Sequence, residues 1–131
     1  MVKNKLEKHT VGTLDQKNLS AVSTGQEFFC IAQPETGRAH VFSQKTKKLL
    51  YSLKMNGSCD TTCFSADERF LYTAGDQAEI YQWDLKQRRC IAKIADEGAF
   101  QTTVVAVSKD GQHMATGSKM GTVNVFNLES S

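Results

Sequence analysis

The chain has 131 residues, 40% hydrophobic and 23% charged, which suits one folded domain with a modest core. Its formal net charge of +2 is too small to indicate nucleic-acid or membrane binding by itself. The first ten residues hold five ionisable side chains, and the longest aliphatic run, Val104 to Val107, is too short to cross a bilayer, so we expect neither a secretory signal peptide nor a membrane span.

Short apolar segments alternate with turns along most of the chain. Residues 1–17 are charged and lack periodicity, and we interpret them as an N-terminal linker or the frayed remnant of a strand. Turn residues such as Pro34 and the Asn56-Gly57 pair separate the segments that follow. No segment has the 3.6-residue spacing of a helix, so we expect almost none. The predicted strands are 19–23, 27–32, 38–42, 48–54, 61–65, 70–74, 79–83, 90–94, 103–107, 112–116 and 122–126.

A repeat sets the register of the whole chain. The pattern of Phe64 to Asp84 returns without a gap, 43 residues later, as Val107 to Asn127. An earlier unit aligns as well, with Phe42 in the position of Trp83 and extra residues in the loop around Pro34. Repeats of about 40–45 residues that end in Trp-Asp are typical of four-stranded propeller blades. We therefore predict an all-β partial propeller with a divergent blade at 18–57, a second blade at 58–98 and an incomplete blade at 99–131.

The Trp83-Asp84 pair and the repeat resemble the WD40-repeat family over residues 18–129. The resemblance implies three blades of a larger, seven-bladed propeller, with Trp83 and Asp84 as a structural dipeptide. The chain departs from the family in two respects. It lacks the Gly-His pair before the first strand, and Gln77 and Met120 stand where a turn aspartate is usual. We therefore do not expect the family's buried His–Asp–Ser/Thr–Trp network to form in its usual way.

Three longer stretches resemble a more particular WD-repeat family, which belongs to the small-subunit processome: KTKKLLYSLKMNG, RRCIAKIADEG and GQHMATGSKMGTVNVFN. This resemblance implies a non-catalytic scaffold in pre-18S ribosomal RNA processing, located in the nucleolus. Its implied partners are other processome proteins, and U3 small nucleolar RNA or pre-ribosomal RNA through phosphate contacts, with no membrane and no small-molecule substrate. It also implies that the chain is a fragment or a short isoform. The alternative is a generic WD40 protein–protein adaptor, for example a substrate receptor of a ubiquitin ligase.

Two equivalent turns carry the candidate binding residues. Their six cations align between the first and second units, Lys45, Lys47 and Lys48 with Lys86, Arg88 and Arg89. A propeller places these turns on one face, so they would form a basic ridge able to contact RNA phosphates without sequence preference. The alternative is that exposed turns carry Lys and Arg for solubility and edge protection. Asp67 and Glu68, expected on the same face, would partly offset the charge.

No catalytic or metal site emerges from the sequence. The Cys59-x3-Cys63 pair with His40 or His113 lacks a second ligand pair for zinc, so we interpret the four cysteines as reduced, buried small hydrophobes. Trp83 repeats as an aromatic residue on a strand, which favours core packing over ligand stacking. There is neither a nucleophile elbow nor a phosphate-cradling glycine loop, so we predict no cofactor and no enzymatic activity.

Overall fold

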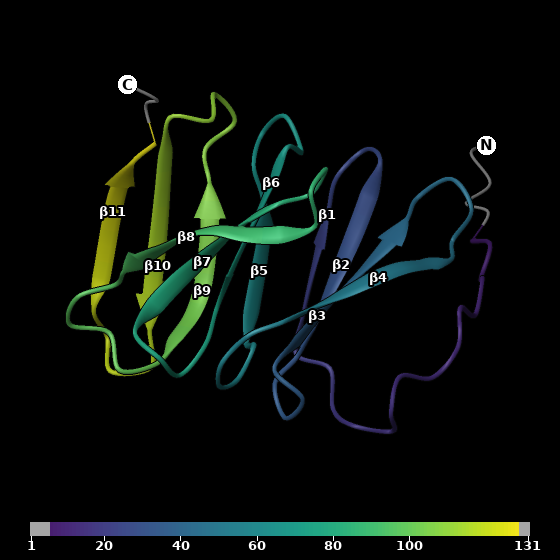
Figure 1. The fold of residues 1–131 in the computed structure, drawn as a ribbon, viewed down its shortest axis with the longest axis horizontal. Coiled ribbons are helices and arrows are strands. Elements are labelled where there is room, and N and C mark those ends of the chain that lie inside the picture. Colours follow the sequence, from purple (N-terminus) through teal and green to yellow (C-terminus); the bar gives the residue numbers. More distant parts are fainter. Residues whose placement is uncertain (1–5, 129–131) are drawn as a thin grey trace, which may run out of the picture.

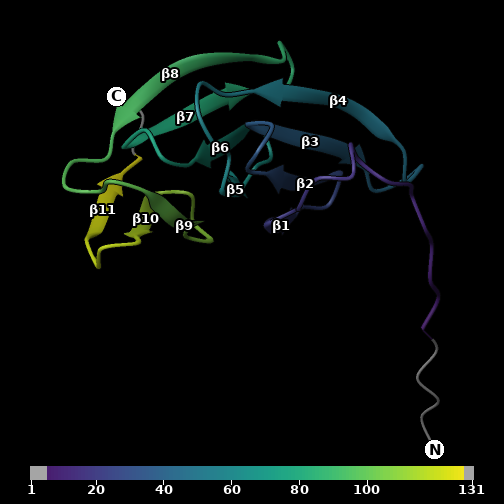
Figure 2. The ribbon, with the colours of Figure 1, turned by 90° about the horizontal axis from the view of Figure 1, so that it is seen from below.

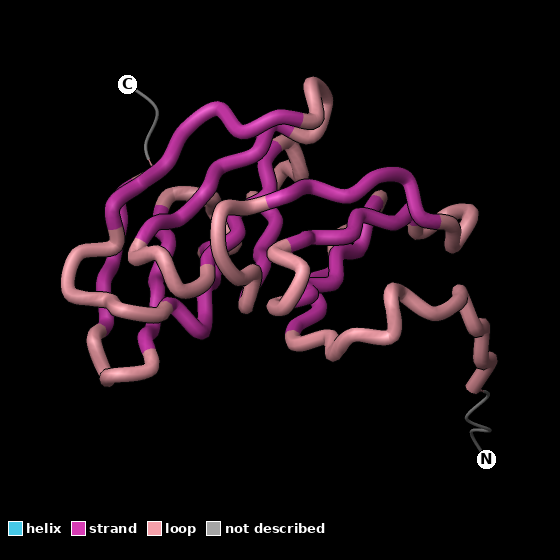
Figure 3. The backbone as a smooth tube through the Cα atoms, turned by 60° about the horizontal axis from the view of Figure 1, so that its bottom comes forward, coloured by secondary structure: helices cyan, strands magenta, loops and turns pink. Residues whose placement is uncertain are grey.

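A computed structural model describes residues 6–128, and this part of the chain folds into β-strands joined by turns, without a helix (Figures 1 and 3). None of its elements is therefore a helix that could span a membrane. The strands are β1 (Ala21–Thr24), β2 (Phe28–Gln33), β3 (Arg38–Ser43), β4 (Leu49–Lys54), β5 (Thr61–Phe64), β6 (Phe70–Ala74), β7 (Glu79–Asp84), β8 (Arg89–Ala95), β9 (Thr102–Val107), β10 (His113–Ser118) and β11 (Val123–Asn127). All the predicted strands are present, with ends displaced by at most two residues.

The strands form three antiparallel sheets in chain order. The first sheet is β1-β2-β3-β4, the second β5-β6-β7-β8, and the third β9-β10-β11. The sheets follow one another along an arc, with β1, β5 and β9 as neighbours on its inner side and β4 and β8 on its outer side (Figure 2). The predicted all-β, partial-propeller fold is confirmed. The sheets fall within the three predicted blade ranges, whose boundaries stay a prediction.

The apolar core lies between the sheets, because each strand sends alternate side chains toward opposite neighbours. One cluster joins the first two sheets, and within it Trp83 is 6% exposed and packs with Leu71 and Val41. Its indole Nε1 donates a hydrogen bond to Thr73 Oγ1 at 2.8 Å. A second cluster joins the second and third sheets around Met114. Trp83 thus occupies the interface between two sheets.

A different residue organises the buried polar groups of the third sheet. Asp96, in the link between β8 and β9, is fully buried. Its carboxylate accepts hydrogen bonds from Thr102 Oγ1 at 2.5 Å, Thr116 Oγ1 at 2.9 Å and Asn124 Nδ2 at 2.7 Å. One acceptor side chain therefore connects all three strands of the sheet, where the sequence provides neither the usual histidine nor the usual turn aspartate.

The first sheet has its own polar network, which also holds the N-terminal segment. His40 Nε2 lies 2.9 Å from Gln33 Oε1, and His40 Nδ1 lies 2.7 Å from Ser52 Oγ. The Gln33 amide donates to the carbonyl oxygens of Leu14 and Lys17. Residues 6–20 contain no strand, and these hydrogen bonds attach them to the end of the first sheet. Residues 1–5 lie outside the described part of the chain.

Candidate nucleic-acid interface

The β3–β4 and β7–β8 turns, which carry the six predicted cations, share one backbone construction. The Lys47 N–H donates to the Ser43 carbonyl at 2.9 Å, and the Arg88 N–H donates to the Asp84 carbonyl at 2.7 Å. Lys47 and Arg88 both adopt left-handed conformations, with φ of 61° and 57°. The two turns therefore present their cations from the same local geometry.

Asp84 shapes its turn through the side chain as well. Its carboxylate accepts hydrogen bonds from the N–H groups of Lys86 and Gln87, both at 2.9 Å. In the first turn the shorter Ser43 hydroxyl accepts from the Thr46 N–H at 3.1 Å. The aspartate of the Trp-Asp pair is thus used locally to close a turn, as Asp and Ser side chains commonly are.

The cations of these turns differ in their surroundings. Five of the six are exposed, and Lys47 is half-buried with its Nζ donating to Gln44 Oε1 at 3.2 Å. The Arg88 guanidinium lies 4.2 Å from the centre of the Tyr51 ring, an arrangement that stabilises the cation on the aromatic face. Within residues 6–128, no Asp or Glu forms an ion pair with any of the six. Among the described residues, the side chains of Lys45, Lys48 and Lys86 make no hydrogen bond, ion pair or ring contact, so these three lysines are best placed to meet an anion.

Alternating strand directions place both turns at the same end of the sheets as the β1–β2 and β5–β6 turns. Figures 1 and 2 show the two basic turns at separate places along the arc. The turns are therefore equivalent in structure and orientation, and their joining into one ridge stays a prediction.

Glu68 has a role that the sequence did not indicate. Its carboxylate accepts hydrogen bonds from the N–H groups of Gln26 at 2.9 Å, Glu27 at 3.0 Å and Phe28 at 3.2 Å. The β5–β6 turn is thereby hydrogen-bonded to the β1–β2 turn. Its neighbour Asp67 is exposed, and hydrogen bonds from the Arg69 N–H and the Ser65 hydroxyl lower the pKa of that carboxyl. Of the two acidic residues, Asp67 presents its charge to solvent while the Glu68 carboxylate is engaged between sheets.

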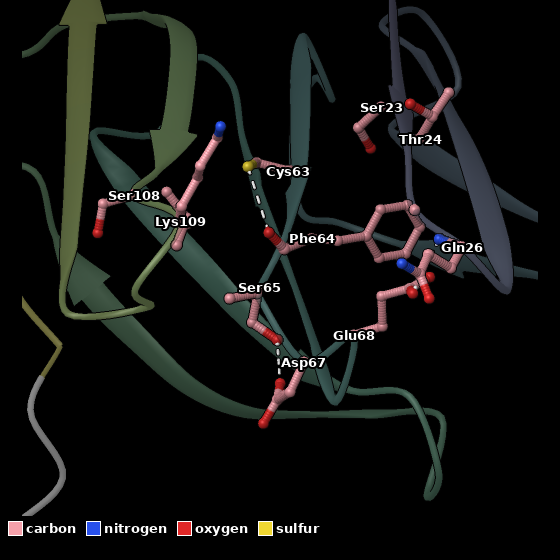
Figure 4. Close-up of a pocket in the computed structure, with 13 residues that line it drawn as sticks. Ser23, Thr24, Gln26, Cys63, Phe64, Ser65, Asp67, Glu68, Ser108 and Lys109 are labelled. Atoms are coloured by element: carbon pink, nitrogen blue, oxygen red, sulfur yellow. Dashed lines mark hydrogen bonds between the residues drawn. The ribbon is translucent and has the colours of Figure 1, made fainter.

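A hollow of about 650 Å³ lies beside these hydrogen bonds of Glu68. It is lined by the ends of β1, β5 and β9 and by the turns that follow them (Figure 4). Its lining is mixed, with hydroxyls such as Ser23, the thiol of Cys63, the Asp67 carboxylate and the Lys109 ammonium. Cys63 donates its S–H to the Phe64 carbonyl, and burial raises the pKa of the thiol. The raised pKa keeps the Cys63 thiol protonated near neutral pH, and a protonated thiol is a poor nucleophile.

The cysteines are distributed between core and half-buried positions. Cys30 and Cys59 are fully buried between the first two sheets, whereas Cys63 and Cys90 are half-buried. All four are free thiols. In the described part of the chain, no three His, Cys, Asp or Glu side chains gather as a metal-ligand set.

Comparison with known proteins places the sequence in context. No protein-family model matches the chain. It is 36% identical over 123 residues to "U3 small nucleolar RNA-associated protein 18 homolog" of Mus musculus and 32% identical over 123 residues to that of Homo sapiens, each match covering 93% of the chain and 22% of the relative. A "WD repeat-containing protein 55 homolog" of Dictyostelium discoideum is 25% identical over 88 residues, 67% of the chain and 21% of the relative. The chain thus spans about a fifth of the length of the curated relatives it matches.

Proposed function

We propose that this chain, which is homologous to U3 small nucleolar RNA-associated protein 18 over 93% of its length, is a non-catalytic scaffold in pre-18S ribosomal RNA processing. The observation that carries the proposal is the 36% identity over 123 residues to a relative whose name states association with U3 RNA. That name supports this function over a ubiquitin-ligase adaptor. The proposed location is the nucleolus, with other proteins of the U3-associated assembly as partners.

The basic turns are the proposed RNA contacts within that role. Lys48 and Lys86 come from equivalent turns, are exposed, and have no acidic partner within residues 6–128. Exposed lysines attract phosphates and release condensed counterions when they bind, which needs no base-specific group. The contacts would therefore add affinity for RNA while leaving sequence selection to other components.

The scaffold role is tested by expressing the tagged chain in cells and quantifying U3 RNA in the purified material. We expect enrichment of U3 RNA over an unrelated small nuclear RNA, and nucleolar concentration of the tagged chain, compared with the tag alone. A diffuse distribution without U3 enrichment, from protein shown by circular dichroism to be folded, would contradict the proposed function.

The phosphate contacts are tested with two matched double variants. Lys48→Glu with Lys86→Glu alters the basic turns, whereas Lys8→Glu with Lys119→Glu makes the same change in net charge at exposed positions elsewhere. Binding to a single-stranded oligoribonucleotide is measured over a salt series. Each lost phosphate contact should reduce the slope of log affinity against log salt by about 0.7 in the first variant and leave the second unchanged. Equal losses in both variants would show a general charge effect and contradict the site.

A further inference from the structure

The outer strands of the first two sheets, β4 and β8, each leave one backbone edge without a neighbouring strand. In the described part of the chain, β4 is hydrogen-bonded to β3 alone and β8 to β7 alone. Both lie on the outer side of the arc, whereas β1, β5 and β9 are neighbours on its inner side (Figure 2). An edge strand presents alternate N–H and C=O groups with which a further strand can pair. Sheets that extend the arc at either end would leave these two edges free.

The two outer strands share an irregularity that exposes an aliphatic side chain. A register shift leaves Leu50 of β4 and Ile91 of β8 without an opposite residue on the neighbouring strand, which is the arrangement of a β-bulge. Leu50 is 40% exposed and Ile91 is 42% exposed. The same surface feature therefore recurs at equivalent positions of two sheets.

The outer strands and the turns that precede them carry cations and no acidic residue. Residues 45–58 contain four lysines, residues 85–95 contain two lysines and two arginines, and neither range contains Asp or Glu. Arg89 and Lys93 of β8 are exposed. Among the described residues, neither of them forms an ion pair. The free edge of β8 is therefore positively charged.

The acidic residues of the neighbouring strand β7 leave this charge in place. Asp84 is buried, and its carboxylate accepts hydrogen bonds from N–H groups of its own turn. Glu79 is half-buried and pairs in register with Ala95, the last residue of β8. The ammonium of Lys93 lies 4.8 Å from the centre of the Tyr81 ring and keeps its charge there.

The charge of this edge limits which strands can pair with it. A second copy of β8 would bring like charges together, which opposes pairing. Residues 6–20 of this chain carry two lysines and two acidic residues, so they do not supply an acidic segment. RNA phosphates would suit the cations but would leave Ile91 and the backbone groups of the edge unused. An extended protein segment with acidic side chains matches the backbone edge, the cations and the aliphatic residue together.

We infer that the free edge of β8 binds an acidic, extended segment of a partner protein, which adds a strand to the second sheet. Main-chain hydrogen bonds would hold the segment, its Asp or Glu side chains would meet Arg89 and Lys93, and an aliphatic side chain would cover Ile91. We place the segment on β8 because Lys54, the one cation within β4, already donates its Nζ to the Met55 carbonyl.

The first test uses the 131-residue chain and a fluorescent peptide of about eight residues in which Glu and Val alternate, a length that matches a strand. Fluorescence anisotropy measures the binding. We expect saturable binding that is lost when the peptide amides are N-methylated, because methylation removes the N–H donors and keeps the charges and side chains. No binding, or equal binding of the N-methylated peptide, would overturn the inference.

Substitutions then locate the segment. Lys93→Glu replaces an attraction by a repulsion and should weaken binding by about tenfold, whereas Lys119→Glu, the same change at an exposed turn, should have little effect. Ile91→Asp should also weaken binding, and Leu50→Asp, at the equivalent bulge of β4, should not. Circular dichroism should show an unchanged fold in each variant. Equal losses in the two lysine variants, or a loss with Leu50→Asp alone, would overturn the placement on β8.

A photo-crosslinking residue in place of Ile91 identifies the source of the segment. The tagged chain is expressed in cells and irradiated, and the crosslinked peptides are identified by mass spectrometry. We expect crosslinks to an Asp- or Glu-rich segment of a different polypeptide. Crosslinks only to RNA, to this polypeptide itself or to segments without acidic residues would overturn the inference, as would their absence.

Discussion

The carboxylate of Glu68 lies directly over Gly25, so that any side chain at position 25 would collide with it. This close approach lets Glu68 reach the N–H groups of Gln26, Glu27 and Phe28. A turn of the second sheet thereby holds a turn of the first through hydrogen bonds to a carboxylate, which are stronger than those between neutral groups. The contact fixes the relative position of two sheets at the end that carries the basic turns.

Glu68→Ala should therefore weaken the interface between the first two sheets. Hydrogen bonds to charged groups contribute about 1.5–3 kcal/mol each at most, and partial exposure reduces this, so we expect a loss of about 1–3 kcal/mol in the free energy of unfolding. Urea denaturation measures it. Gly25→Ala should also destabilise, because its Cβ displaces the carboxylate. Glu97→Ala, at an exposed glutamate, should change stability by less than about 0.5 kcal/mol, and an equal loss there would contradict the assignment.

The strands and their register could be predicted because they depend on local alternation and on turn spacing that recurs along the chain. The position of Trp83 between sheets follows from the same repeat. Glu68 could not be predicted, because its repeat equivalent is Gly111 and its partners are about 40 residues away in sequence. The sequence repeat predicts only features that recur in each unit, whereas the hydrogen bonds of Glu68 occur in one unit alone. Its neighbour Asp67, with local partners only, behaves as a turn residue should.

The buried hydrogen-bonding role of Asp96 could not be predicted for a different reason. A charged residue beside Glu97 and Gly98 has the composition of an exposed link, and Asp is almost never fully buried unless paired. Its partners are two hydroxyls and an amide from three strands, and nothing in the sequence indicates that these groups donate hydrogen bonds to Asp96. The sequence showed which family residues were missing but not which residue replaced them.

Asp96→Ala should be one of the most destabilising substitutions in the chain. It leaves the buried Thr102 and Thr116 hydroxyls without their acceptor, while the half-buried Asn124 amide keeps its hydrogen bond to the Glu97 carbonyl. Each unsatisfied buried donor costs about 1–3 kcal/mol, so we expect the two hydroxyls together to lower the free energy of unfolding by about 2–6 kcal/mol. Urea denaturation measures the loss, and Glu97→Ala, the adjacent exposed residue, is the control. A loss below about 1 kcal/mol would show that the two hydroxyls find other acceptors.

His40 should make the fold sensitive to mild acid. Burial and the nearby Arg38 cation lower the pKa of His40 below its ordinary value of 6.5, and Asp15 opposes them. The folded state therefore favours the neutral imidazole. The resulting stability is present above pH 6.5 and is lost as the pH falls below that value toward the lowered pKa. The urea midpoint should fall between neutral pH and about pH 5, and His40→Gln should flatten that fall.

The matched control is His113→Gln, because His113 is exposed at the start of β10. Its removal should leave the pH dependence of the wild-type chain nearly unchanged. If both variants flatten the curve equally, or if neither does, another group is responsible for the acid sensitivity.

The buried thiols should report whether the first two sheets separate. Burial raises the pKa of Cys30 to about 12 and also raises that of Cys59, so both stay protonated and unreactive in the folded chain near pH 8. Since the folded pKa values are raised, the stability that the two thiols contribute is present below their ordinary pKa of 9.0 and is lost as the pH rises above it, toward about 12 for Cys30.

Alkylation by iodoacetamide, followed by peptide mass spectrometry, should modify the half-buried Cys63 and Cys90 before Cys30 and Cys59. Unfolding in urea should abolish the difference. Glu68→Ala should speed labelling of Cys30, because the hydrogen bonds between the β5–β6 and β1–β2 turns are lost while the thiol itself is unchanged. Glu97→Ala should leave the rate as it is. Labelling of Cys30 in the native chain as fast as in the unfolded chain would mean that the first two sheets do not form a stable interface.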